Sequence, residues 1–245
     1  MAARREPLTA HIGRTVIKTY CRRQLARSVE LSVEGRANVP ATGPALLVAR
    51  HVHHLLDGCI LMTRLERPLH ALVAVDWATP GPKRRLLDLA TGLVRWPTIL
   101  RDDAPHPGAS GERRRRLSAA ARECVALLRE NRLLLMFPEG YPAIDPHPTP
   151  KTSLDDFLPF RQGFVWIAER AGDVPIIPVG FWYGESGQGW RVVVRLGEAM
   201  CLDAFPSRAA ASAAVEARVR MLSEPPADAN VDQPRYPRGR NPSGT

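Results

Sequence analysis

Cysteine and long apolar runs are both scarce in this chain. Four cysteines are scattered over 245 residues without a Cys-x-x-Cys pair, which favours reduced, mostly buried thiols in a reducing compartment. No apolar run reaches about 18 residues, and the N-terminus lacks the pattern of a secretory signal. We therefore expect neither a transmembrane span nor export, and we predict a cytoplasmic protein whose membrane contact is peripheral, at the inner face.

Aromatic residues are also few, and acidic residues are outnumbered. Aromatics make up 6% of the chain, and the formal net charge is +9, which favours anionic partners such as nucleic acid, anionic lipid or phosphorylated substrates. The basic residues occur in short groups without the interleaved aromatic side chains that stack on bases. We therefore expect no nucleic-acid partner and favour an anionic membrane surface.

Apolar runs and helical patterns alternate along most of the chain, whose length suits one large domain. This alternation predicts an α/β fold, a single domain with a mostly parallel sheet flanked by helices. The predicted strands are 31–35, 44–48, 72–75, 98–100, 133–137, 175–179 and 191–196. The predicted helices are 15–29, 59–67, 83–93, 113–129, 163–170 and 209–222, with a surface excursion over 141–159. The predicted divisions are a basic N-terminal segment with an amphipathic helix (1–30), the main domain (31–223) and a disordered tail (224–245).

The N-terminal amphipathic helix has apolar positions such as Val16 and Tyr20 beside basic ones such as Lys18 and Arg22. One interpretation is a helix that packs on the core with a solvated basic side. The other is a helix that lies on anionic lipid. The two are compatible.

Three histidines and an aspartate follow the predicted strand 44–48: His51, His53, His54 and Asp57. Strand ends are where α/β folds place their chemistry, and a carboxylate close to an imidazole can orient it as a general base. A capped, solvated helix start and a zinc site are the alternatives. No second cluster elsewhere in the sequence completes a zinc site, so we assign no metal ligand.

Taken together, four stretches resemble motifs of the glycerolipid acyltransferase family, typified by 1-acylglycerol-3-phosphate acyltransferases. The stretches are His51 to Asp57, Gly92 to Arg101, Phe137-Pro138-Glu139-Gly140, and Val174-Pro175-Ile176-Ile177-Pro178-Val179. They occur in the family's order and at sensible spacing over roughly residues 30 to 205.

The resemblance implies transfer of a fatty acyl group, with a role in phospholipid biosynthesis. An acyl thioester, on coenzyme A or acyl carrier protein, would donate to a hydroxyl of a lysophospholipid or related lipid, and no cofactor would be needed. His51 would be the general base and Asp57 its orienting carboxylate. Arg101 and the block Phe137, Pro138, Glu139 and Gly140 would bind the acceptor.

The chain departs from the family pattern in two places. Five residues separate His51 from Asp57 where the family has four, so His53 stays an alternative base. Tyr141-Pro142-Ala143 stands where the family generally has Thr-Arg-Ser, whose arginine contacts phosphate, so a glycerol phosphate acceptor does not follow. The alternative function is a catalytically inactive protein of this fold that docks on anionic membranes.

Overall fold

A computed structural model describes residues 8–76, 78, 81–101, 109–172, 174–187 and 189–229. The strands are β1 (Val29–Glu34), β2 (Ala45–Ala49), β3 (Leu69–Ala71), β4 (Val73–Ala74), β5 (Thr98–Ile99), β6 (Leu133–Met136), β7 (Ile176–Ser186) and β8 (Gly189–Leu196). The helices are α1 (Leu8–Ser28), α2 (Leu56–Arg64), α3 (Pro82–Leu93), α4 (Ala109–Arg129), α5 (Gly163–Ala171) and α6 (Arg208–Leu222). Two short 3-10 helices are η1 (Arg36–Asn38) and η2 (Leu202–Ala204).

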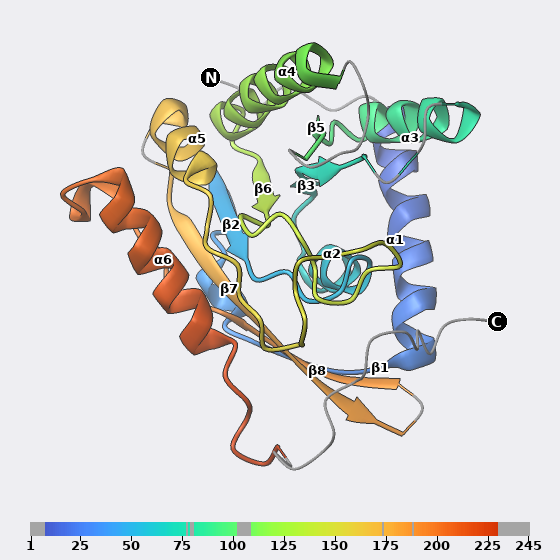
Figure 1. Ribbon diagram of the computed structural model, residues 1–245, viewed down its shortest axis with the longest axis vertical. Helices are drawn as coiled ribbons and strands as arrows, with labels where there is room; N and C mark the ends of the chain where they lie inside the picture. The colour runs from blue at the N-terminus through green and yellow to red at the C-terminus, as the bar shows by residue number, and fades with distance from the viewer. Residues whose placement is uncertain are drawn as a thin grey trace.

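The main sheet has six strands in the order β1-β8-β7-β2-β6-β3 (Figure 1). All neighbouring strands are parallel except β7 and β8, which form an antiparallel hairpin. The short strands β4 and β5 pair in parallel as a separate two-stranded sheet. This architecture confirms the predicted α/β fold with a mostly parallel, helix-flanked sheet.

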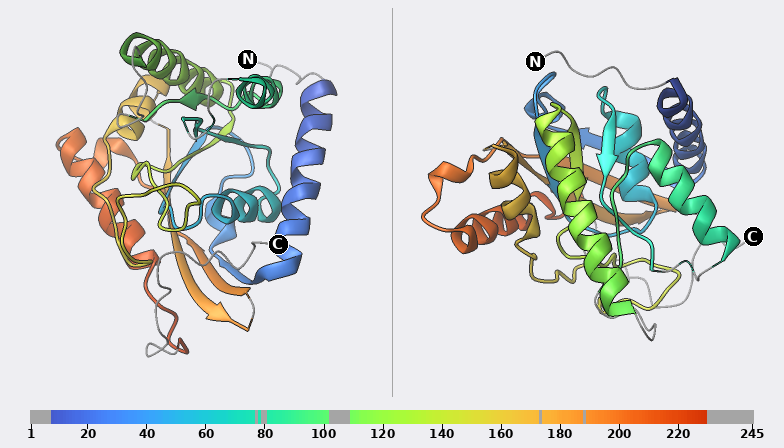
Figure 2. Two further views of the ribbon diagram at one scale, coloured as in Figure 1. Left: turned by 45° about the vertical axis from the view of Figure 1, so that its right-hand side comes forward. Right: turned by 90° about the horizontal axis from the view of Figure 1, so that it is seen from above.

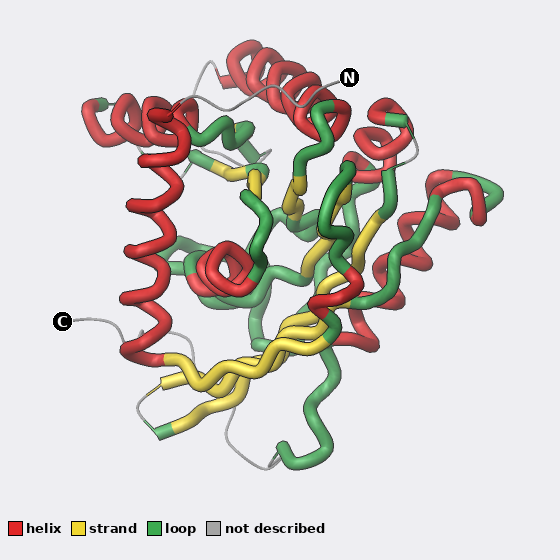
Figure 3. The backbone as a smooth tube through the Cα atoms, turned by 180° about the vertical axis from the view of Figure 1, so that it is seen from behind, coloured by secondary structure: helices red, strands yellow, loops and turns green. Residues whose placement is uncertain are grey.

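The central strands are buried on both faces, and successive side chains enter different cores. In β2, Leu47 belongs to a core shared with α1 and α2, whereas Leu46 and Val48 belong to a core shared with α4, α5 and α6. This separation follows from the two-residue period of a strand. Figure 3 shows red helices on either side of the yellow strands, so the fold is a sheet between two helical layers.

Helix α1 is longer than predicted, since it begins at Leu8 and not near Thr15. Its inner side packs on α2, where Cys21 and Leu25 are buried. Its outer side carries the exposed Val16 and Tyr20. The predicted apolar stripe is therefore divided between the core and the surface.

Three other expectations differ from the structure. The predicted strand 72–75 corresponds only to β4, which belongs to the small sheet, whereas β3, which was not predicted, lies just before it and joins the main sheet. The predicted strand 175–179 continues to Ser186, because Gly180 to Ser186 pair with β8. The sequence also predicts an exposed loop over 102–111, but 109–111 belong to the first turn of α4, and 102–108 lie outside the described residues. Residues 230–245, the last part of the predicted tail, also lie outside them, while Arg191 forms an ion pair with Asp228 in the first part of that tail.

The predicted surface excursion 141–159 instead folds back onto the molecule, and we call these residues the site loop. Tyr141 and Lys151 in it are buried. Ile144 pairs with the segment after β2: its amide donates to the Val52 carbonyl at 2.7 Å, and its carbonyl accepts from the His54 amide at 3.0 Å. The site loop therefore lies directly beside the histidine segment.

Candidate active site

The register of two parallel strands brings two of the candidate residues together. Val48 of β2 lies beside Met136 of β6, and His51 and Glu139 each follow three residues later. The His51 amide donates to Glu139 Oε1 at 2.8 Å. The carboxyl ends of the two central strands thus place the histidine segment and the Phe-Pro-Glu-Gly block in contact, as expected for chemistry at a strand end.

His51 forms a side-chain pair with Asp57. The distance from His51 Nδ1 to Asp57 Oδ2 is 3.0 Å, and Asp57 is fully buried while the His51 side chain is 15% exposed. Phe137 stacks on the imidazole with ring centroids 4.0 Å apart. If Nδ1 donates to the carboxylate, Nε2 is left as the proton acceptor, and no group among the described residues forms a hydrogen bond with it.

Asp57 is held by three further donors. The backbone amides of Val52 and His53 donate to Oδ2 at 2.7 and 3.0 Å, and the Tyr183 hydroxyl donates to Oδ1 at 2.6 Å. Asp57 also lies in the first turn of α2, where the helix dipole favours a negative charge. Both oxygens of the buried carboxyl group therefore have hydrogen-bond partners within the protein.

His53 occupies a different position. Its Nδ1 accepts hydrogen bonds from the amides of Leu55 and Leu56 at 3.2 and 3.4 Å, at the start of α2. The side chain is buried, and burial lowers its pKa to about 4. The neutral ring therefore accepts from the first amides of α2, as a helix cap does. The contact of His53 with Asp57 is made by its backbone amide alone.

Glu139 is a buried side chain whose two oxygens both contact protein donors. Oε1 accepts from the His51 amide, and Oε2 accepts from the Leu158 amide at 2.9 Å and forms an ion pair with Lys151 Nζ at 2.6 Å. Both side chains of the pair are 0% exposed. Burial lowers the pKa of Lys151, and the neighbouring Glu139 carboxylate opposes that shift.

Arg101, predicted to bind the acceptor, is also largely buried. It forms an ion pair with Asp76 at 2.8 Å, donates to the Gly140 carbonyl at 3.3 Å and lies over the Tyr141 ring, 4.3 Å from its centroid. It therefore joins the end of β5 to the last residue of the Phe-Pro-Glu-Gly block and to Tyr141, which follows the block.

Pro138 and Gly140 shape the turn after β6. The Pro138 carbonyl accepts from the Arg161 amide at 3.2 Å, which brings the chain before α5 next to the block. The Gly140 amide closes the turn onto the Phe137 carbonyl at 3.0 Å, and Gly140 has φ of +80°, a conformation that favours glycine. The block is thus a tight turn that directs Glu139 inward.

Two residues at the site, Tyr183 and Lys151, were not among those predicted from the sequence. Tyr183 lies on β7 at two-residue spacing from Phe181 and Val179, so the three side chains share one face of the strand. A predicted strand that extended to Tyr183 would have indicated this. Lys151 lies in the site loop among prolines and polar residues, where nothing in the local pattern predicts burial.

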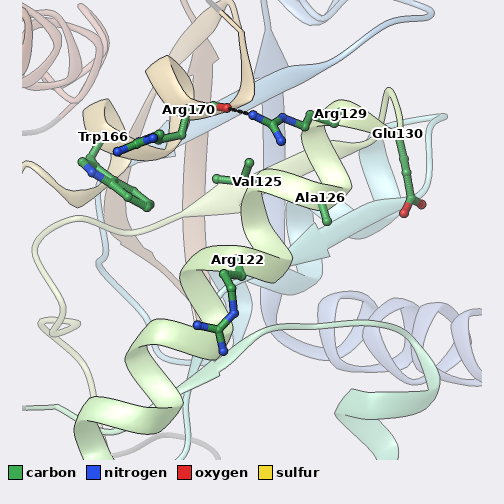
Figure 4. A pocket seen from close by; sticks show the side chains of 7 residues that line it. All are labelled: Arg122, Val125, Ala126, Arg129, Glu130, Trp166 and Arg170. Atoms are coloured by element: carbon green, nitrogen blue, oxygen red, sulfur yellow. Dashed lines mark hydrogen bonds between the residues drawn. The ribbon is translucent and has the colours of Figure 1, made fainter.

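The described residues contain no cluster of three or more His, Cys, Asp or Glu side chains suited to a metal ion. A separate groove of about 600 Å³ lies between α4 and α5 (Figure 4). Its lining residues are Arg122, Val125, Ala126, Arg129, Glu130, Trp166 and Arg170. None of them is a candidate site residue.

The fold and the site define a class: an α/β protein with an imidazole and a carboxylate paired at the end of a central strand. Residues 30–182 match the acyltransferase family, and the chain belongs to that family. The match confirms the family predicted from the four motifs. A comparison with curated proteins finds no match.

Among solved structures, the fold is similar to that of the 1-acyl-sn-glycerophosphate (LPA) acyltransferase PlsC from Thermotoga maritima, with a TM-score of 0.59. The sequences are 19% identical, and the similarity covers 85% of this chain and 77% of that one. At this identity the likeness shows the fold. In the part of the chain that the structure describes, no helix combines the length and hydrophobicity needed to cross a membrane.

Proposed function

We propose that this acyltransferase moves a fatty acyl group from an acyl thioester to a hydroxyl of a lysophospholipid or related lipid, with His51 as general base. The observation that carries the proposal is the 3.0 Å contact between His51 Nδ1 and the buried Asp57. Family membership supplies the reaction class, and the geometry supplies a residue able to perform it.

In the proposed reaction, His51 Nε2 accepts the proton of the acceptor hydroxyl as its oxygen attacks the thioester carbonyl. Asp57 holds the ring and stabilises the imidazolium that forms. The tetrahedral intermediate then collapses, an oxygen ester remains, and the thiolate of coenzyme A or acyl carrier protein leaves and takes up the proton. No acyl-enzyme is required.

His51 is favoured over His53 as the base by their different partners. His51 has a carboxylate on one ring nitrogen and a partly exposed side chain. His53 has its Nδ1 engaged by backbone amides and is buried. A general base needs both an orienting partner and access to substrate, and His51 meets both conditions.

We further propose that α1 and α3 bring the enzyme to an anionic membrane, where the acceptor lies. Large apolar side chains are exposed at helical spacing on both helices: Ile12, Val16 and Tyr20 on α1, and Leu86, Leu89 and Leu93 on α3. The two helices approach each other where Gly13 of α1 faces Val94, the residue directly after α3, as Figure 2 shows for the ribbons. Exposed apolar residues beside basic ones suit a helix surface that enters an anionic lipid interface.

The proposal is tested by release of free thiol from palmitoyl-coenzyme A, with a panel of lysophospholipids and neutral lipid alcohols as acceptors. Because general-base catalysis contributes roughly 10²- to 10⁴-fold, His51→Ala should lower acceptor-dependent release by that order. His53→Ala should lower it far less. A repeat with acyl carrier protein as the carrier distinguishes the two donor classes.

The matched control is His11→Ala, which removes an exposed histidine on α1. Circular dichroism establishes that each variant is folded. Full activity in His51→Ala would contradict the assignment of the base. No release from the wild type with either donor class and any acceptor would favour the inactive docking protein instead.

A further inference from the structure

One buried ion pair forms hydrogen bonds with both the amide and the carbonyl of His51. Glu139 Oε1 accepts from the His51 amide at 2.8 Å, and Lys151 Nζ donates to the His51 carbonyl at 2.7 Å. The same two side chains meet each other at 2.6 Å. The two side chains and the backbone of His51 therefore form a closed ring of contacts.

This pair costs free energy to bury, so it demands an explanation. Lys151 is among the largest fully buried side chains of the protein, although lysine is seldom buried unless it is paired. An apolar pair of similar volume would fill the same space without desolvating two charges. The contacts to His51 are what a charged pair provides here and an apolar pair could not.

Contacts of the site loop with the histidine segment hold Lys151 in this position. Its Ile144 pairs with the segment that carries His53, and the Leu158 amide donates to Glu139 Oε2. Arg50, the neighbour of His51, donates to the Leu154 carbonyl and lies 4.2 Å from the centre of the Phe157 ring. The loop is thus fastened to the histidine segment before and after Lys151.

We propose that Lys151 and Glu139 are positioning residues for the general base, which fix the backbone of His51 so that its ring meets Asp57 and the acceptor. This assignment rests on the proposed function. It gives Glu139 a role through His51, in place of the acceptor contact that the motif resemblance implies. The charged groups that surround Lys151 are Glu139, Asp57 and Arg50, and Glu139 forms the ion pair with it.

The test compares the wild type with Lys151→Met, Glu139→Gln and the double variant. Because small displacements of a catalytic group have large effects on rate, Lys151→Met should lower kcat by about 10- to 100-fold. KM for the thioester should stay within about twofold, since neither residue is assigned to substrate binding. The acidic limb of the pH–rate profile should move to higher pH, because a positive charge close to His51 is removed.

The double variant removes both charges of the ion pair, so neither partner is left buried and charged without the other. It should recover folding stability relative to Lys151→Met while kcat stays low, because a methionine side chain has no donor for the His51 carbonyl. The matched control is Arg95→Met, which breaks ion pairs with Glu123 and Glu130 outside the site. It should lower the melting temperature and leave kcat unchanged.

Hydrogen exchange at the His51 amide tests the same inference without turnover. Exchange should become at least about tenfold faster in Lys151→Met while the amides of β2 stay protected. Unchanged kcat, pH profile and His51 exchange in a folded Lys151→Met would overturn the inference even if the wild type is active. Faster His51 exchange in a protein without transferase activity would support the positioning role and contradict the proposed function alone.

Discussion

At the scale of the residue, Asp57 explains how the longer spacing to His51 is accommodated. The chain between the two residues curls around the carboxylate, so that the amides of Val52 and His53 both donate to Oδ2 beside His51 Nδ1. The additional residue is absorbed in this turn. A histidine six positions before the aspartate therefore still reaches it, and a count of residues cannot decide between His51 and His53.

Tyr183 provides a side-chain hydroxyl bound to Asp57, and its removal gives the first prediction. Tyr183→Phe leaves Oδ1 of a fully buried carboxylate without its 2.6 Å donor. A buried acceptor that loses its partner costs about 1–3 kcal/mol, so the free energy of unfolding should fall by that amount. We also expect kcat to fall, because Asp57 is less firmly held.

Urea denaturation and thiol release measure the two effects. Tyr20→Phe is the matched control for stability, since Tyr20 is 49% exposed on α1 and its substitution should leave the free energy of unfolding unchanged. Equal stability of Tyr183→Phe and the wild type would show that the hydroxyl does not support Asp57.

At the scale of the element, the structure shows which sequence patterns suffice. The apolar runs of β2 and β6 are predicted correctly because strands buried on both faces must be apolar throughout. The far end of β7 is missed, because Gly180 to Ser186 include glycines and polar residues whose strand character depends on pairing with β8. The burial of the site loop depends on Lys151 reaching Glu139, a contact between distant parts of the chain that no local pattern encodes.

The exposed faces of α1 and α3 carry the prediction at the scale of the element. Val16 and Leu89 are 64% and 61% exposed, and burying an apolar side chain of this kind contributes about 1.5–3 kcal/mol. The double variant Val16→Glu with Leu89→Glu should therefore bind vesicles of phosphatidylglycerol and phosphatidylcholine at least about tenfold more weakly.

Sedimentation with such vesicles measures the partitioning. Met221→Glu is the control, because Met221 is 56% exposed but lies on α6, in the opposite helical layer. An equal loss of binding in the control would show that the added negative charge, and not the surface of α1 and α3, is responsible.

At the scale of the whole molecule, two buried histidines make the fold sensitive to acid. Burial lowers the pKa of both His53 and His70 from 6.5 to about 4. His70 contributes to the attachment of α1, since its Nε2 accepts from Arg14 and its Nδ1 donates to the Arg95 carbonyl, both at 3.1 Å. Both rings must stay neutral to keep their contacts.

Between pH 6.5 and pH 4 the unfolded chain binds protons that the folded chain does not, so stability falls as the pH falls. Each histidine accounts for up to about 3 kcal/mol of this loss. We expect His70→Gln to show a smaller difference in unfolding free energy between pH 7 and pH 4.5 than the wild type, as measured by urea denaturation at both values. An identical difference would mean that His70 titrates normally in the folded protein.

The two outer strands of the main sheet differ in how they face their surroundings. Strand β3 spans only Leu69–Ala71, and β1 turns Glu30, Ser32 and Glu34 outward in alternation. A strand of a second molecule could form few backbone hydrogen bonds with the short β3. At β1 it would lie beside exposed carboxylates. A protein with exposed apolar side chains on α1 and α3 is thereby protected against growing into continuous sheets with its own copies.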